Sequence, residues 1–234
     1  GMNLQNIPVA EKAKIKSKDY IHLPNIRKLF IPDPGYTFFD QDLDRADLQV
    51  VVWEADDSDL KRALRENLDM HCLNACAIFD LKGIPYDELR ESHPNYKEHR
   101  ARIGEAYRGK AKAGVHATNY GVGDRKLAQA LGITVHEASG FRARWFAAHP
   151  GIRKWHLRTE EAAGKRGYIE NKFGARLYTL GVVNLPELLG WLPQSTVAGV
   201  INRVLVNIDG AEQAGETSIQ LLLQCHDSLA GQFL

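Results

Sequence analysis

The sequence predicts an α+β fold, with many helices and a few short strands. Apolar residues recur at helical spacing along most of the chain, and only a few short segments have the aromatic and β-branched composition of strands. Mixed helices with few strands are typical of the α+β class. The chain has 234 residues, of which 44% are hydrophobic and 25% charged. These values are typical of globular proteins, and the length suffices for one large domain or two smaller ones.

Helix start and stop signals divide the chain into helical segments. One helix is expected to be capped by Asp57 or Ser58, and the next by Asp69. Pro94 can start a long helix that runs to about Tyr120 and ends at the glycines that follow. Further helices are expected over residues 45–55, 124–131, 135–148, 151–165 and 192–208.

Strand signals are confined to three regions. Residues 36–42 read as a short aromatic strand that ends in acids, and residues 168–180 read as a hairpin that turns at Lys172–Gly174. A strand from Ser218 to Cys225 is followed, after a short turn, by a returning strand. The predicted strands are therefore few and short.

The chain lacks the features of a membrane span and of a secretory signal. Its longest apolar runs are far short of the ~18 residues that a membrane helix needs. The N-terminal residues lack the charged-then-apolar pattern of a signal peptide. Three cysteines, Cys72, Cys76 and Cys225, cannot make a disulfide framework and fit a reducing compartment. We therefore expect a cytoplasmic protein with no membrane partner.

The formal net charge of +1 hides a strong segregation of charge along the chain. Residues 40–69 carry a net charge of −6, whereas residues 97–176 carry +10. Such stretches can be solvated faces of helices. They also suit a polyanion surface beside a cation site, because phosphates bind Lys and Arg while metal ions bind carboxylates. Charge alone leaves both interpretations open.

Two of the predicted strands end at an aspartate. Asp42 closes the strand over 36–42, and Asp227 lies in the turn after Cys225. An acid at a hairpin tip beside another strand's terminal acid can hold two divalent cations, which stabilise both the attacking and the leaving oxygen of a phosphoryl transfer. Aspartates at strand ends also commonly form turns. Spacing alone does not decide between the two.

A stripe of polar side chains follows one face of the predicted long helix. Arg108, Lys112, His116 and Tyr120 are each four residues apart, so they form a slowly drifting stripe about 18 Å long. Two cations and an imidazole on one face can grip a triphosphate, with the terminal aromatic left to stack on a base. The alternative is an exposed cationic face with Tyr120 packed in the core.

Eight short segments along the chain can be read as sequence motifs, and their order matters as much as their residues. They are Leu4–Pro8, Asp42–Leu48, Arg108-x3-Lys112-x7-Tyr120-Gly121, His149–Ile152, Gly167–Ile169, Gly174–Tyr178, Pro193–Thr196 and Gln224–Asp227. This ordered set resembles the motifs of family A (DNA polymerase I-like) DNA polymerases. The resemblance spans the chain from Leu4 to Leu229.

The resemblance implies a role for each residue that matches a family motif. Asp42 and Asp227 match the two catalytic aspartates that hold a pair of Mg²⁺ ions. Lys112 matches a lysine that binds the incoming triphosphate and can donate a proton to the pyrophosphate leaving group. The other implied contacts with the nucleotide come from His71, Arg108, His116, Tyr120 and Asp47.

Within that set, His71 and Arg108 match residues that meet the triphosphate, and Tyr120 matches the aromatic that stacks near the nascent base pair. Asp47 matches an acidic steric gate against a ribose 2′-hydroxyl. For DNA, the resemblance implies a minor-groove contact by Gln194. It also implies that His226, which directly precedes a metal aspartate, lies at the DNA.

The resemblance also implies a domain organisation and a function. Residues 2–57 and 186–234 are expected to form a palm, a small antiparallel sheet with helices that is incomplete at its C-terminus. Residues 58–185 are expected to form the mainly helical fingers. Thumb and exonuclease domains are expected to be absent. The implied function is a template-directed DNA polymerase core that uses dNTPs and a DNA primer-template in the cytoplasm of a bacterium or a phage-infected cell, with missing polymerase segments supplied in trans.

The sequence departs from the family pattern at several positions, and two alternatives to a DNA polymerase core stay open. Ser228 stands where the family usually has Glu, His116 where it usually has an aromatic, and Asp47 where it usually has Glu. Ser228 is shared with single-subunit phage-type RNA polymerases, so RNA synthesis is one alternative. The other is a non-catalytic or split nucleic-acid-binding fragment of a family A polymerase.

Overall fold

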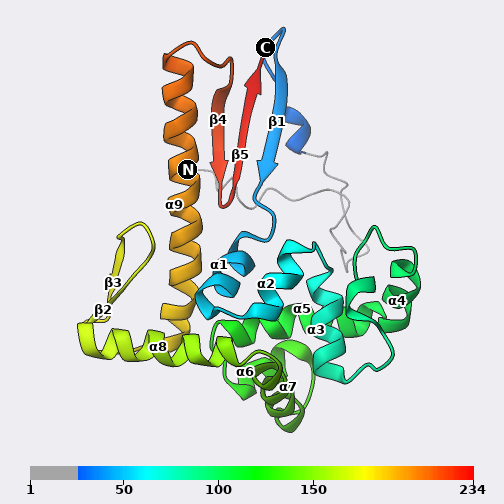
Figure 1. Ribbon diagram of the computed structural model, residues 1–234. Helices are drawn as coiled ribbons and strands as arrows, with labels where there is room; N and C mark the ends of the chain where they lie inside the picture. Colours follow the sequence, from blue (N-terminus) through cyan, green and yellow to red (C-terminus); the bar gives the residue numbers. More distant parts are fainter. Residues whose placement is uncertain (1–25) are drawn as a thin grey trace, which may run out of the picture. The chain divides into compact units, whose positions relative to one another are not determined.

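The structure is a computed structural model that describes residues 26–234 (Figure 1). It confirms the α+β class, with many helices and two small antiparallel sheets. The described chain divides into two compact units, one formed by residues 26–46 and 197–234 and the other by Asp47–Thr196. The motif segment Leu4–Pro8 lies outside the described residues.

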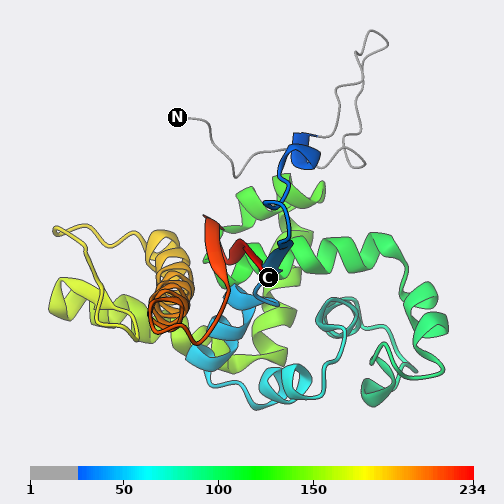
Figure 2. The same ribbon diagram turned by 90° about the horizontal axis from the view of Figure 1, so that it is seen from above.

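The first unit is built around a three-stranded antiparallel sheet in the order β1-β5-β4. Strand β5 lies between its two partners, and Figures 1 and 2 show the C-terminal half of α9 running beside β4. The elements of this unit are the short 3₁₀ helix η2 (Ile26–Leu29), β1 (Thr37–Asp42), β4 (Gln220–Cys225), β5 (Ser228–Phe233) and the C-terminal half of α9 (Leu185–Gln213).

The pairing of β1 with β5 fixes which residues share the end of the sheet. Phe39 pairs with Gly231, and a Cβ on Gly231 would lie 2.7 Å from the Phe39 ring and 2.4 Å from the Gln220 carbonyl oxygen. Only glycine therefore fits at this point of the central strand. The same register places Asp42 opposite Ser228.

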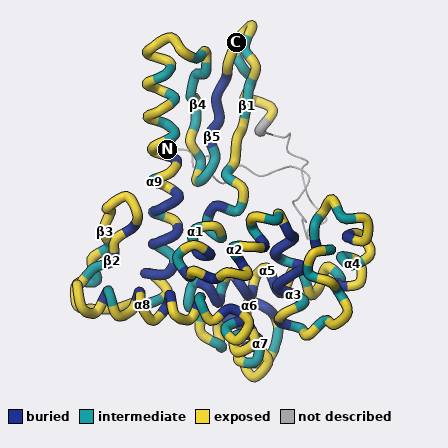
Figure 3. The backbone as a smooth tube through the Cα atoms, in the orientation of Figure 1, coloured by how far each residue is buried: buried dark blue, intermediate teal, exposed yellow. Residues whose placement is uncertain are grey.

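The second unit is mainly helical. Its helices pack around one core, whose buried residues appear dark blue in Figure 3. Its elements are α1 (Ala46–Ala55, whose first residue belongs to the other unit), α2 (Ser58–Arg65), α3 (Met70–Phe79), η3 (Tyr86–Glu88), α4 (Tyr96–Ile103), α5 (Glu105–Asn119), α6 (Asp124–Leu131), α7 (Val135–Ala148), α8 (Pro150–Arg166), β2 (Tyr168–Glu170), β3 (Arg176–Tyr178) and the N-terminal half of α9.

The predicted helix caps are confirmed. Asp57 accepts a hydrogen bond from the Leu60 N–H at 3.0 Å, and Asp69 accepts from the N–H groups of His71 and Cys72 in the first turn of α3. A third cap, Thr134, forms a reciprocal capping box with Glu137. The sequence identifies caps because the capping side chain and the N–H groups that it satisfies are only two or three residues apart.

The prediction of one long helix from Pro94 to Tyr120 is wrong. The segment forms two helices, α4 and α5, that meet at Gly104. Gly104 has φ +78° and ψ 148°, a backbone conformation that ends α4 and that glycine adopts without steric cost. The hydrogen-bonded ladder is therefore interrupted just before the polar stripe, which lies on α5.

The last helix begins earlier than predicted. Helix α9 starts at Leu185 rather than Leu192 and continues through Pro193 to Gln213. Pro186 lies in its first turn, where a missing N–H leaves no helical carbonyl unsatisfied. A start at Leu192 would likewise place Pro193 in the first turn of the helix. Proline is acceptable at both places, so the prolines do not decide where the helix begins. Among the described helices, none combines the length and apolar character needed to cross a membrane.

A close contact between α5 and α7 yields a stability prediction. A Cβ on Gly114 would lie 2.4 Å from the Phe141 ring, which is buried in the core. Gly114→Ala should therefore lower the free energy of unfolding by about 1–3 kcal/mol, as overpacking does. Urea denaturation followed by circular dichroism measures the change.

Gly109 on the same helix provides the matched control. A Cβ there meets nothing within 4 Å. Gly109→Ala should be neutral or should stabilise the protein by about 0.5–1 kcal/mol through helix propensity. Equal effects of the two substitutions would contradict the packing argument.

Candidate functional site

The two sequence-predicted metal aspartates lie together at one end of the three-stranded sheet. Asp42 ends β1 and pairs with Ser228, the residue after Asp227. The Leu43 N–H donates a hydrogen bond to the Asp227 carbonyl at 3.1 Å, which ties the end of β1 to the β4–β5 turn. The side chains of Asp42 and Asp227 are themselves close enough to share a hydrogen bond.

The electrostatics of this carboxylate pair suit a cation. Slight desolvation of its carboxylate, the charge of Asp227 and then that of Asp40 raise the pKa of Asp42 above its usual value, although Asp42 is exposed. A divalent cation would relieve this repulsion, and Mg²⁺ is commonly held by one or two carboxylates together with water and substrate phosphates. Within residues 26–234 no group of three or more His, Cys, Asp or Glu side chains is placed to hold a metal ion, so the candidate centre consists of the pair.

His226 and Ser228 flank Asp227 in the turn between β4 and β5. His226 is exposed, with φ +55°, and its carbonyl accepts a hydrogen bond from the Gln224 side chain at 3.2 Å. The Ser228 hydroxyl donates to the Cys225 carbonyl at 2.9 Å. The serine that stands in place of the usual Glu therefore forms a hydrogen bond within the turn.

In the helical unit, a pocket of about 390 Å³ brings together most of the residues expected to meet a nucleotide. It lies among α1, α3 and α5, and one wall is apolar. The polar residues that line it include four predicted site residues, which are His71, Lys112, His116 and Tyr120. The apolar wall comes from Leu48, Val51 and Val115. Such a pocket can take a ligand with one flat apolar part and one charged part.

Tyr120 is fixed at the end of the pocket by Asp47. The Tyr120 hydroxyl donates a hydrogen bond to Asp47 Oδ2 at 2.9 Å, and burial together with the Asp47 charge raises the pKa of Tyr120. His116 lies edge-on against the Tyr120 ring, with a centroid distance of 4.6 Å. Tyr120 also packs against the core, so one residue both closes the pocket and contributes to packing.

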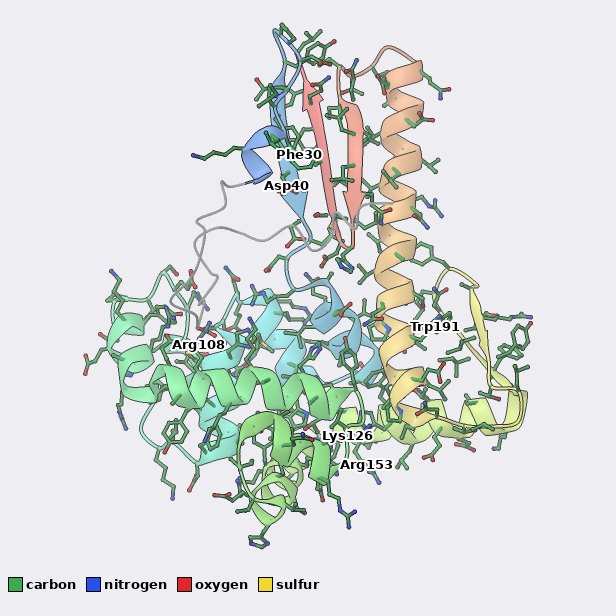
Figure 4. All side chains as sticks on the ribbon, turned by 180° about the vertical axis from the view of Figure 1, so that it is seen from behind. Phe30, Asp40, Arg108, Lys126, Arg153 and Trp191 are labelled. Atoms are coloured by element: carbon green, nitrogen blue, oxygen red, sulfur yellow. The ribbon has the colours of Figure 1, made fainter. Side chains whose placement is uncertain are left out.

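Arg108 lies one turn of α5 before Lys112 and is not among the residues that line the pocket. Its guanidinium pairs with Asp69, with Nε at 3.2 Å from Oδ2 and Nη2 at 3.5 Å from Oδ1. Figure 4 labels Arg108 near the N-terminal end of α5. The structure therefore confirms the placement of Arg108 on the helix and adds a partner that the sequence did not predict.

Asp69 keeps its charge although it is buried. Burial alone would raise the pKa of Asp69, but hydrogen bonds from Tyr96, Cys72 and Arg108 lower it to about 2. The neighbouring Cys72 shows the opposite effect, because burial and the Asp69 charge raise the pKa of its thiol to about 12. The ionised carboxylate and neutral thiol form a stable pair, with Sγ 3.3 Å from Oδ2.

The C-terminal end of α5 is held by a second buried network. The Asn119 side chain accepts a hydrogen bond from Trp145 Nε1 at 2.9 Å, and the Asn119 carbonyl contacts His156 Nε2 at 2.8 Å. Burial lowers the pKa of His156 to about 4, so the imidazole is neutral near pH 7 and donates this hydrogen bond. Asn119 lines the pocket, and the network therefore fixes the pocket's floor.

Gln194 is exposed on α9, and its neighbour Ser195 contacts the loop that joins β2 to β3. Asn171 accepts hydrogen bonds from the N–H groups of Phe173 and Ala175 and donates to the Ser195 hydroxyl at 3.1 Å. The hairpin is thus fastened to α9 one residue after Gln194.

Sequence reasoning missed the two residues that hold α5 in place. Asp69 was expected only as a helix cap, and Asn119 was not expected to have a role. Their partners are 39 residues away for the Asp69–Arg108 pair and 26 residues away for the Asn119–Trp145 pair. No local pattern reports contacts at such separations.

Comparisons with known proteins agree on one family. A family model described as DNA polymerase family A matches residues 1–233. The chain is 28% identical over 244 residues to DNA polymerase I of Pseudomonas aeruginosa, and 30% identical over 236 residues to the thermostable DNA polymerase I of Thermus filiformis. Each alignment covers 97% of this chain but only 23% and 25% of the respective relative, so the chain spans about a quarter of their length.

Among solved structures, the chain is similar to the POL domain of Pol1 from M. smegmatis, which is in complex with a DNA primer-template and a dNTP. The TM-score is 0.76 at 25% sequence identity, and the match covers 99% of this chain and 38% of that chain.

The low pKa of Asp69 yields a prediction about acid stability. An acid whose pKa is lowered by folding stabilises the fold above its ordinary pKa, and this contribution is lost as the pH falls toward the folded value. Asp69→Asn should thus destabilise the protein by about 2 kcal/mol near neutral pH, and the difference from wild type should shrink by about 1 kcal/mol at about pH 3. Urea denaturation at several pH values measures both. A difference that stays constant with pH would show that the Asp69 charge does not stabilise the fold.

Proposed function

The chain belongs to DNA polymerase family A, and from this membership we propose that it is a template-directed DNA polymerase core that adds dNTPs to a primer 3′-hydroxyl by two-metal nucleotidyl transfer. The observation that carries this proposal is the carboxylate pair of Asp42 and Asp227 at one end of the sheet. The similar M. smegmatis domain, in complex with primer-template and dNTP, supports the same two substrates for this chain.

In the proposed reaction, Asp42 and Asp227 are catalytic and hold two Mg²⁺ ions through their carboxylate oxygens. When bound, the ions lower the pKa of the primer hydroxyl and neutralise charge on the triphosphate. The raised pKa of Asp42 is consistent with a pair that lacks compensating donors of its own. Because the two carboxylates lie close together, they would hold the ions at one place, where the primer hydroxyl and the triphosphate can meet.

The pocket on α5 is proposed to take the incoming nucleotide. Lys112 is exposed on the pocket's rim, where it can bind the triphosphate and give a proton to the leaving pyrophosphate. His71 and Arg108 add contacts to the phosphates, and the Tyr120 ring stacks near the base. Asp47, whose carboxylate anchors Tyr120, is proposed to exclude a ribose 2′-hydroxyl.

Two further residues are proposed to contact DNA. Gln194 is exposed and its amide can donate to and accept from base edges in the minor groove. His226 is exposed at the turn that carries Asp227, where it can donate to a primer phosphate.

The domain and cellular assignments follow the same proposal. Residues 2–57 with 186–234 are proposed as the palm and residues 58–185 as the fingers. The protein is proposed to act in the cytoplasm of a bacterium or a phage-infected cell. The chain spans about a quarter of its relatives' length. We propose that polymerase segments supplied in trans support extension.

Replacement of either metal aspartate tests the proposed reaction. Asp42→Asn and Asp227→Asn should each reduce primer extension by about 10²-fold or more, because each removes a ligand that contributes several kcal/mol of charge stabilisation. The assay follows extension of a labelled primer with Mg²⁺ and dNTPs, with and without the remaining segments of a family A polymerase.

Asp40→Asn is the matched control. Asp40 lies on β1 two residues from Asp42 and contributes charge to the same region, but it has no proposed role as a ligand (Figure 4). Extension by this variant should stay within about threefold of wild type, since only a screened surface charge is lost. Undiminished extension by both Asp42→Asn and Asp227→Asn would refute the proposed function.

His116 offers a test of the nucleotide pocket. Replacing it with Phe changes the ring that lies against Tyr120 and borders the pocket, so discrimination between deoxy and dideoxy nucleotides should change by about tenfold. The ratio of kcat/KM for dNTP and ddNTP measures the discrimination. Lys110→Ala, on the same helix but outside the pocket, should leave the ratio unchanged. An unchanged ratio in His116→Phe would show that His116 does not face the nucleotide.

A further inference from the structure

The Arg108 guanidinium is held by one edge. Asp69 contacts Nε and Nη2 side-on, and the Asp69 side chain is only 4% exposed, against 24% for Arg108. Neither of these two hydrogen bonds to Asp69 involves Nη1. Because the guanidinium is planar and its five N–H groups form a rigid fork, fixing one edge also fixes the direction of the other.

The Asp69 carboxylate is itself immobilised by donors from two other elements. Its Oδ1 accepts from the N–H groups of His71 and Cys72 at 3.0 and 3.1 Å, and its Oδ2 accepts from the Tyr96 hydroxyl at 2.8 Å. The donors come from the first turn of α3 and from α4. The carboxylate cannot turn toward Arg108 or away from it without breaking these contacts.

The same carboxylate also holds a residue that lines the pocket, His71. His71 lines the pocket, and its backbone N–H is one of the two that Asp69 caps. One buried acid therefore sets both the direction of Arg108 and the position of the α3 turn that carries His71. Arg108 and His71 are two of the three residues that are proposed to bind the triphosphate, and Lys112 on α5 is the third.

We propose that Asp69 is a positioning residue for nucleotide binding, which rests on the proposed function and extends it. Asp69 holds Arg108 so that the Nη1 edge is presented to triphosphate oxygens, and it fixes the α3 turn for His71. A long flexible side chain with an unfixed guanidinium would lose more conformational freedom on binding phosphate, so the pair increases affinity by preorganisation.

If Asp69 blocked Arg108 instead of positioning it, replacing Asp69 would have the opposite effect on nucleotide affinity. If Asp69 instead sequestered Arg108, the triphosphate would have to displace the carboxylate, and removal of the Asp69 charge would tighten nucleotide binding. A positioning role requires that the same change weaken binding. The sign of the change therefore separates the two roles.

The experiment measures binding of dATP and of deoxyadenosine to the whole chain with Mg²⁺ by isothermal titration calorimetry. Asp69→Asn should weaken dATP binding by about tenfold, because one ordered charge contact is lost, and should leave deoxyadenosine binding unchanged, since that ligand has no phosphates. In primer extension, KM for the dNTP should rise more than kcat falls.

Two further variants test whether the effect passes through Arg108. In an Arg108→Ala background, Asp69→Asn should weaken dATP binding much less than it does in wild type, with only the part carried by His71 remaining. Tyr96→Phe removes one donor to Asp69 but keeps the helix cap and the ion pair, so it should weaken dATP binding by a smaller factor than Asp69→Asn.

Asp57→Asn is the control for loss of stability. Asp57 is also a buried helix-capping aspartate, is 7% exposed, and pairs with His149 at 3.2 Å rather than with a proposed phosphate ligand. Its replacement should lower stability without changing affinity for dATP. An equal loss of affinity in this control, or unchanged or tighter dATP binding in Asp69→Asn, would overturn the inference. Failure of the wild-type chain to bind dATP at all would overturn the proposed function, and this inference with it.

Discussion

The buried carboxylate of Asp69 is the interaction on which the geometry of the helical unit depends. A buried charge is costly unless donors surround it, and here the donors come from α3, α4 and α5 at once. The carboxylate starts α3, accepts from the Tyr96 hydroxyl of α4 and pairs with Arg108 of α5. Because these helices share one anion, none of them can shift without leaving that anion undersatisfied.

Helix α5 is restrained at three points along its length. Arg108 is held near its start, Gly114 allows α5 to pack closely against Phe141 in its middle, and Asn119 is held at its end by Trp145 and His156. The pocket lies along this same helix, so these buried contacts also fix the positions of the polar residues that line the pocket. A site on a rigid, well-supported helix keeps its geometry better than one on a loop.

Much of the fold follows from local sequence signals, whereas the site's supports do not. The caps at Asp57 and Asp69 and the acids at the ends of β1 and at the β4–β5 turn were predictable, because cap, turn and strand end are decided within a few residues. The break at Gly104 was missed, because a glycine inside a helical pattern reads as a tolerated weak point until its positive φ is known. The Arg108–Asp69 pair depends on how three helices pack, which no short pattern encodes.

Asp69 and Asp42 differ in how far their charge is compensated, and this difference fits the positioning role that we propose for Asp69 and the ligand role that we propose for Asp42. Asp69 is surrounded by donors and one cation, and its pKa falls to about 2. Asp42 faces mainly other acids, and its pKa rises. A carboxylate whose charge is already compensated by hydrogen-bond donors is stabilised little by a metal ion, and its role is to hold the helices around it. A carboxylate repelled by its neighbours is stabilised by any cation that it binds, and metal binding should therefore occur at the sheet end and not at the helix cap.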